Sequence, residues 1–244
     1  MFEWSVNDAI VLLIALVVIV VVTILLAYIL RGRSEKVKKI PLYVISGLII
    51  ILEIVRQVNY IVAGYDLNVI PLHFFNLVLF AFPLMLFSKG KLKSLGNAMT
   101  IVVVTMCAIC LYLTPGKVLG SEATSTMFTS FDSFYIVLYY QLSILFLILS
   151  FVLQLLDFDI STIVYFWLSF LIYSAFILVL SYWLEVAFIN PLEYLVPVLE
   201  DFRLKFGMIL YSTVMFLLTC GIGGILFMVE RALDSVIKGK YNAY

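Results

Sequence analysis

Long apolar runs recur along the whole chain, and they restrict its fold more than any other feature of the sequence. The first run, residues 9–30, holds 22 residues without a single charge. An α-helix of about 20 residues crosses the roughly 30 Å hydrocarbon core of a bilayer. Within lipid a spanning segment must satisfy its own backbone polar groups, which favours helices for such runs. The sequence therefore predicts an all-α membrane protein.

Seven such windows are predicted as the transmembrane helices of one domain, residues 1–244. Their limits are 9–30, 40–62, 71–88, 95–113, 131–154, 160–185 and 207–230. Charged residues make up 12% of the chain, about half their share in soluble domains. The formal net charge is zero, and nucleic-acid binding depends on basic surfaces. We therefore expect membrane lipids as partners, no nucleic acid, and a location in the cell membrane.

The basic residues of the loops predict the orientation, because lysine and arginine accumulate in short cytoplasmic loops. Loops after the odd-numbered windows, with the C-terminal tail, hold eleven basic residues, whereas the other loops hold three. This difference predicts an N-terminus outside and a C-terminus in the cytoplasm. With that orientation, most ionisable residues of the windows fall in the outer half of the bilayer.

Glu53 and Arg56 lie inside the second window, where a charge costs at least about 2.5–3.5 kcal/mol on insertion scales. They are three residues apart and Gln57 follows, so the three side chains share one face of a helix. The pair indicates either a structural ion pair or a ligand site. Both alternatives remain open at the level of sequence.

Further polar residues are predicted at a similar depth. His73 and Asn76 begin the third window three residues apart, and we expect them on one helical face. Asp132 and Tyr135 begin the fifth window. We predict a polar pocket in the outer half, with His73 as the candidate catalytic residue. The predicted substrate-binding or structural residues are Glu53, Arg56, Gln57, Asn76, Asp132 and Tyr135.

The cysteines carry little functional signal. Cys107 and Cys110 form a C-x-x-C pair inside the fourth window, but cysteine is also a common apolar residue of protein interiors. No cluster of histidine and cysteine of the kind that binds zinc surrounds His73. We therefore predict neither a metal nor a cofactor. The glycine-rich segment 220–224 is predicted to be a close-packing patch between helices.

Several short motifs resemble one known family. The segment 71–73, Pro-Leu-His, precedes an apolar helix with Pro83 and then a basic turn. Together with Glu53 in the preceding window, Thr114 and Pro115 after the fourth, and an aromatic start of the fifth, this pattern resembles the YwaF-like family of bacterial membrane proteins. The resemblance covers most of residues 40–150 and implies a bacterial plasma membrane.

The family is related to eukaryotic lipid acyltransferases that use a cysteine and a histidine. The resemblance therefore implies acyl transfer, with His73 as general base. The chain departs from the pattern at two positions, because Phe75 stands in place of the nucleophilic cysteine and Gln141 in place of a further histidine. Three functions stay open: lipid binding or acyl transfer, a small-solute transporter subunit, and a non-catalytic structural membrane protein.

Overall fold

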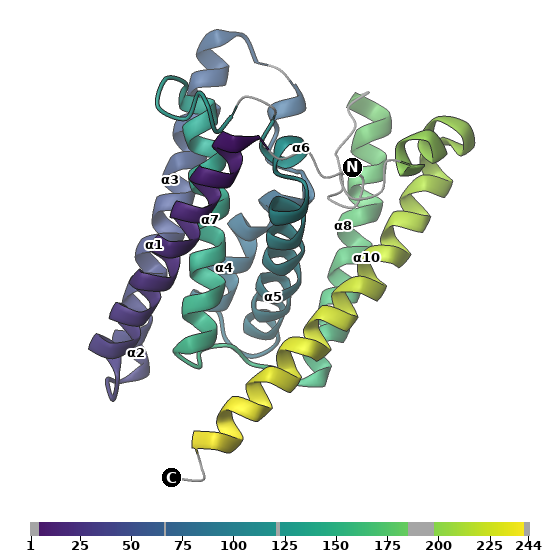
Figure 1. Cartoon of the computed structure of the whole chain (residues 1–244). Coiled ribbons are helices and arrows are strands. Elements are labelled where there is room, and N and C mark those ends of the chain that lie inside the picture. The colour runs from purple at the N-terminus through teal and green to yellow at the C-terminus, as the bar shows by residue number, and fades with distance from the viewer. Residues whose placement is uncertain (1–4, 66, 121–122, 185–197, 242–244) are drawn as a thin grey trace.

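A computed structural model describes residues 5–65, 67–120, 123–184 and 198–241 (Figure 1). This part of the chain is helical and contains no strand. The longer helices are α1 Val6–Leu30, α3 Ile40–Ala63, α5 Gly90–Leu113, α7 Phe131–Val152, α8 Ile160–Leu184 and α10 Val198–Tyr241. The shorter elements are α2 Glu35–Lys38, α4 Val78–Phe87, α6 Pro115–Leu119 and the 3₁₀ turns η1 Leu67–Val69 and η2 Phe74–Leu77.

Five helices of the described chain are long and apolar enough to cross a membrane: α1, α5, α7, α8 and the part of α10 from Ile209 to Val236. The outer helices expose large aliphatic side chains, among them Leu13 at 62% and Ile172 at 71%. Contiguous apolar surface of this kind is unusual on soluble proteins. The prediction of an all-α chain with several membrane-compatible helices is thus confirmed.

The third predicted window, 71–88, is helical over most of its length, but its helix begins three residues later than predicted. Only residues Phe74–Phe87 form a short apolar helix there, η2 followed by α4. The Leu72 N–H donates to the Ile70 carbonyl at 2.7 Å, a tight turn that a helix cannot contain. His73 has an extended backbone at φ −66° and ψ 153°. The expectation that His73 and Asn76 share a helical face is therefore wrong.

The other six predicted windows coincide with helices, within a few residues at most ends. The predicted sixth window ends at residue 185, which lies outside the described residues. The last helix is longer than predicted and breaks at Gly207, whose positive φ of 79° interrupts it. α3 has 24 residues and carries the charged pair. It is not among the five helices counted above.

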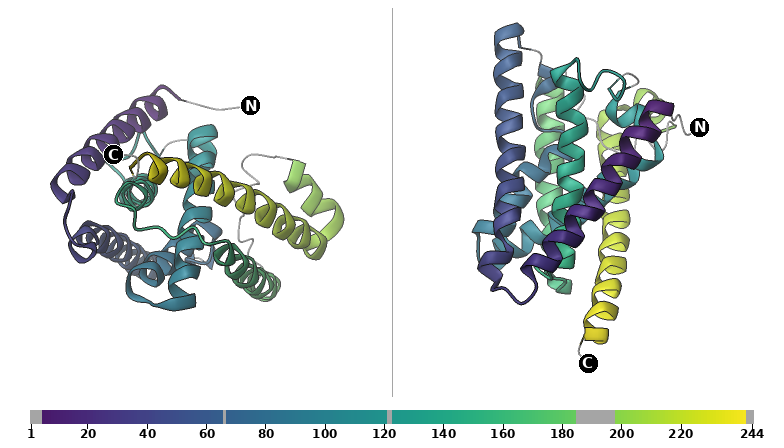
Figure 2. Two further views of the ribbon diagram at one scale, coloured as in Figure 1. Left: turned by 90° about the horizontal axis from the view of Figure 1, so that it is seen from below. Right: turned by 60° about the vertical axis from the view of Figure 1, so that its left-hand side comes forward.

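α5 lies at the centre of the bundle and contacts α4, α7, α8 and α10 (Figures 1 and 2). Its contact with α4 is unusually close. A Cβ atom added at Gly96 would lie 2.7 Å from the Leu84 carbonyl carbon and 2.9 Å from the Ala81 oxygen. Phe82 of α4 also stacks on Phe146 of α7 with ring centroids 3.7 Å apart. Small and flat side chains therefore bring these helices together.

The glycine-rich segment of α10 packs against both α5 and α8. A Cβ atom at Gly223 would lie 2.6 Å from a Val102 methyl group, and one at Gly224 would lie 3.2 Å from the Trp167 ring. The Trp167 indole donates to the Cys220 carbonyl at 3.1 Å. This agrees with the predicted close-packing patch.

The connections of the bundle are divided between its two ends. At one end Glu35, Lys38 and Lys93 line a cleft together with residues 153–157 of the α7–α8 connection. This is the basic end, at the bottom of Figure 1. The last turns of α3, the turns η1 and η2, the short helix α6 and the first turns of α7 meet at the opposite end, where the candidate site lies.

Candidate functional site

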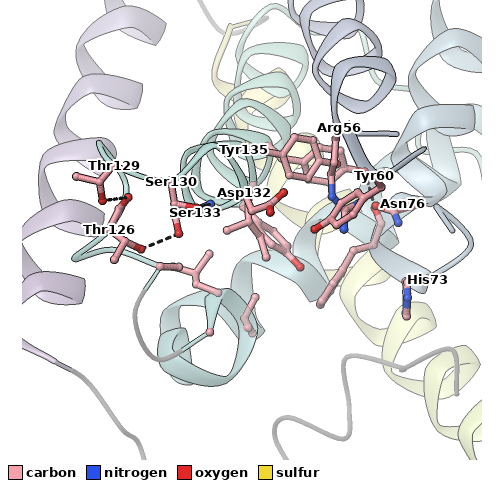
Figure 3. Close-up of a pocket in the computed structure, with 18 residues that line it drawn as sticks. Arg56, Tyr60, His73, Asn76, Thr126, Thr129, Ser130, Asp132, Ser133 and Tyr135 are labelled. Carbon is pink, nitrogen blue, oxygen red and sulfur yellow. Dashed lines mark hydrogen bonds between the residues drawn. The ribbon is translucent and has the colours of Figure 1, made fainter. Parts of the chain in front are cut away.

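A cavity of about 730 Å³ opens at the end of the bundle opposite the basic connections. Its walls come from the last turns of α3, from η2 and the residue before it, from α6 with the loop that follows, and from the start of α7 (Figure 3). Its volume lies within the range of about 300–1,000 Å³ that is usual for small-molecule sites. One end of the fold thus gathers polar side chains from segments far apart in the sequence.

Five of the seven predicted site residues line this cavity. They are Arg56, His73, Asn76, Asp132 and Tyr135. Glu53 and Gln57 are not part of the lining and stand behind it on α3. The structure therefore separates the charged pair of the second window, because only Arg56 faces the cavity.

Glu53 is the centre of a buried hydrogen-bond network, with 5% of its surface exposed. It accepts a hydrogen bond from the Tyr135 hydroxyl of α7 and another from the Gln57 amide at 2.6 Å. The same amide nitrogen donates to the Val69 carbonyl at 2.8 Å, and Tyr65 donates to the Gln57 carbonyl oxygen at 2.7 Å. Glu53 thus ties α3 to α7 and, through Gln57, to the turn that follows α3.

Arg56 holds its charge at the wall of the cavity. Its guanidinium is 3.6 Å from Glu53, a long contact compared with the hydrogen bonds that the carboxylate already accepts. The same group lies over two aromatic rings, 5.3 Å from the centre of Tyr60 and 4.8 Å from that of Tyr135. Cation–π contacts of this kind hold an arginine guanidinium against aromatic faces, here at the wall of the cavity. Arg56 is thus positioned to bind an anion.

Phe75, the position at which the resemblance leads one to expect a cysteine, belongs to the aromatic wall of the cavity. Phe75 is buried and packs edge-on against Tyr140, with centroids 5.1 Å apart. Its carbonyl accepts a hydrogen bond from the Tyr139 hydroxyl at 3.2 Å. Cys107 and Cys110 are buried in α5, and neither forms a disulfide bond. Neither is among the described residues that line the cavity.

The loop between α6 and α7 and the first turn of α7 supply hydroxyl groups that the sequence analysis did not assign. Thr126, Thr129, Ser130 and Ser133 line the cavity, and the Thr126 and Ser133 hydroxyls are 2.7 Å apart. Ser130 caps α7 by accepting from the backbone N–H of Ser133. The density of serine and threonine in residues 124–133 was the available signal. Most of this segment lies between the fourth and fifth apolar windows, and only its last three residues fall inside the fifth.

The first turn of α1 anchors this loop. The Thr124 hydroxyl donates to Asp8 at 2.6 Å, and Asp8 is only 2% exposed. Asp8 also accepts from the backbone N–H of Ser5, whose own hydroxyl accepts from the N–H of Asp8. This reciprocal cap is a common helix start. The N-terminus of α1 therefore positions the loop that closes one side of the cavity.

Two side chains of opposite charge line the cavity. Arg56 and Asp132 are its arginine and its carboxylate, and His73 is its titratable imidazole. The Tyr60 hydroxyl interacts with both the guanidinium and the Asp132 carboxylate, and Figure 3 shows the three side chains close together at one wall. Within the described residues no group of three or more His, Cys, Asp or Glu side chains could hold a metal ion.

These features define a class: a helical protein with several apolar, membrane-compatible helices and a polar cavity at one end. Comparison with known proteins adds no closer assignment, because the chain matches no family model, no curated protein and no solved structure. The chemistry of the cavity is therefore the basis for assigning a function to this chain.

Proposed function

We propose that the protein is a multi-pass protein of the cell membrane that binds a lipid by the anionic part of its headgroup. The observation that carries this proposal is Arg56, held at the cavity wall by two tyrosine rings and only loosely paired with Glu53. Arginine binds phosphate and carboxylate with a planar fork of donors. The hydroxyl groups around it add further donors to the same headgroup.

The proposal includes a topology of seven spans, with α3 and the short η2–α4 element completing the five long apolar helices. The N-terminus is outside, the C-terminus is in the cytoplasm, and the cavity lies in the outer half of the bilayer. The excess of lysine and arginine at the opposite end of the bundle supports this orientation. Single cysteines placed at Lys117 and Lys36 test it: a membrane-impermeant thiol reagent added to intact cells should label only the first.

Acyl transfer is not part of the proposal. His73 lines the cavity, which fits the resemblance to YwaF-like proteins. A thioester mechanism would also need a thiol, and Phe75 fills the place where the family has one. Lipid binding without covalent chemistry, a role that the sequence left open, needs only groups that the lining already contains.

The decisive experiment compares lipid retention by the purified chain and by Arg56→Gln. We expect the substitution to lower the amount of co-purified phospholipid roughly tenfold, because hydrogen bonds to charged groups contribute about 1.5–3 kcal/mol. Glu53 keeps its Tyr135 and Gln57 partners, so the variant should fold. Arg33→Gln, at the basic end, is the matched control. Equal lipid retention by both variants and the parent would refute the proposal.

A further inference from the structure

We infer that the ligand of this cavity is a zwitterion that carries an anion and a primary ammonium group on one short headgroup. This inference rests on the proposed function, in which Arg56 binds the anion, and it names the class of headgroup. It starts from the charges of the lining. Arg56 and Asp132 both line the cavity, so an anion alone would meet attraction at one group and repulsion at the other. A zwitterion complements both charges.

Arg56 and Asp132 are placed so that one ligand can contact both of them. Arg56 comes from the end of α3 and Asp132 from the first turn of α7, and among the described ion pairs Arg56 is joined to Glu53 and not to Asp132. The Tyr60 hydroxyl interacts with both groups. Figure 3 shows this hydroxyl at the cavity wall beside Asp132. A short headgroup can therefore reach both charges without crossing the cavity.

The chemistry around Asp132 selects a primary amine over a quaternary one. Quaternary ammonium groups are recognised by the faces of aromatic rings, and here Arg56 occupies faces of Tyr60 and Tyr135. A primary ammonium group has three N–H donors. Asp132 and the hydroxyl oxygens of Ser130 and Thr129 in the same lining are acceptors for these donors. A trimethylammonium group has no donor to offer them.

Two sources supply this chemistry: an aminophospholipid in the membrane and a free amino-phosphate or amino acid. The test uses the full chain in nanodiscs of defined composition and measures bound ligand by native mass spectrometry. The probes are dioleoyl phosphatidylethanolamine, dioleoyl phosphatidylcholine, dioleoyl phosphatidylglycerol and free O-phosphoethanolamine. We expect phosphatidylethanolamine to bind on the order of tenfold more tightly than phosphatidylcholine, because its amine can hydrogen-bond to a charged acceptor.

Asp132→Asn should abolish this preference while leaving the binding of phosphatidylglycerol unchanged or stronger. Asp157→Asn, at the opposite end of the bundle, is the matched control and should leave the preference intact. Equal binding of phosphatidylethanolamine and phosphatidylglycerol, unaffected by Asp132→Asn, would refute the inference that the ligand is a zwitterion. Binding of O-phosphoethanolamine as tight as that of the lipid, and lost in Asp132→Asn, supports the zwitterion and assigns it to a soluble source.

The two proposals fail in different ways. If Arg56→Gln lowers the binding of every phospholipid but Asp132→Asn changes no preference, the anion site stands and the zwitterion is wrong. If Arg56→Gln leaves phospholipid binding unchanged while the variant remains folded, Arg56 is not an anion site. The inference of a zwitterionic ligand is then refuted as well, because it depends on that site.

Discussion

Replacing Gly96 by alanine should destabilise the bundle, because the backbone of α4 lies directly against this glycine of α5. The added Cβ atom would lie 2.7 Å from the Leu84 carbonyl carbon and 2.9 Å from the Ala81 oxygen, and closer still to the Met85 nitrogen. Ordinary van der Waals contact begins near 3.4 Å. All three atoms belong to the α4 backbone, so no side chain can rotate away and the helix itself must move.

The distance by which α4 must move determines how much free energy of unfolding is lost. The Leu84 contact alone is short by about 0.7 Å, and α4 also packs through the stacked pair Phe82 and Phe146. Overpacking of this kind typically costs about 1–3 kcal/mol. Alanine would by itself favour the helix over glycine by up to about 1 kcal/mol. We therefore expect a net loss of roughly 1–2 kcal/mol in the free energy of unfolding.

Gly47 provides the matched control. It lies inside α3, and no neighbouring atom lies within 4 Å of a Cβ built there. Gly47→Ala should therefore be neutral or slightly stabilising. The measurement is equilibrium unfolding of the purified protein in mixed dodecyl maltoside and sodium dodecyl sulfate micelles, followed by tryptophan fluorescence. A Gly96→Ala protein as stable as Gly47→Ala would refute the close packing of α4 on α5.

Two further substitutions test the polar networks. Tyr135→Phe keeps the ring beside Arg56 but removes the hydroxyl that donates to Glu53, so we expect a loss of about 1.5–3 kcal/mol in the free energy of unfolding. In a double-mutant cycle, Tyr135→Phe should cost much less stability when Glu53→Gln is already present. Fully additive losses for the two substitutions would argue against the hydrogen bond. Thr124→Val removes the tether to Asp8 and should make the loop before α7 more susceptible to limited proteolysis. Thr129→Val, whose hydroxyl is exposed, should not; equal cleavage of both variants would contradict the tether.

Hydrophobic patterning determined the helical class and most helix positions, since a run of about 20 apolar residues has one way to satisfy its backbone in lipid. Each of the seven predicted windows contains a helix for this reason. Local turn geometry decided where the helix within residues 71–88 begins. The 2.7 Å bond from the Leu72 N–H to the Ile70 carbonyl depends on backbone angles that apolarity does not encode.

The candidate site, too, was predictable from the sequence only in part. Helical periodicity correctly placed Glu53, Arg56 and Gln57 on one turn of α3, and the cost of a charge in an apolar helix indicated either a structural ion pair or a ligand site. Periodicity gave no means to tell which of the two charges faces the cavity. That was decided by α7, because the Tyr135 hydroxyl reaches Glu53 and its ring supports Arg56.

The sequence did not predict that the loop after α6 lines the cavity, for a related reason. Its threonine and serine side chains enter the cavity because Asp8, more than a hundred residues earlier, holds Thr124 in place. Local sequence determined which residues can form helices and which charges need partners, because both depend on the transfer of groups from water to an apolar medium. Only the tertiary structure decided which partners they have, because that choice depends on contacts between segments far apart along the chain.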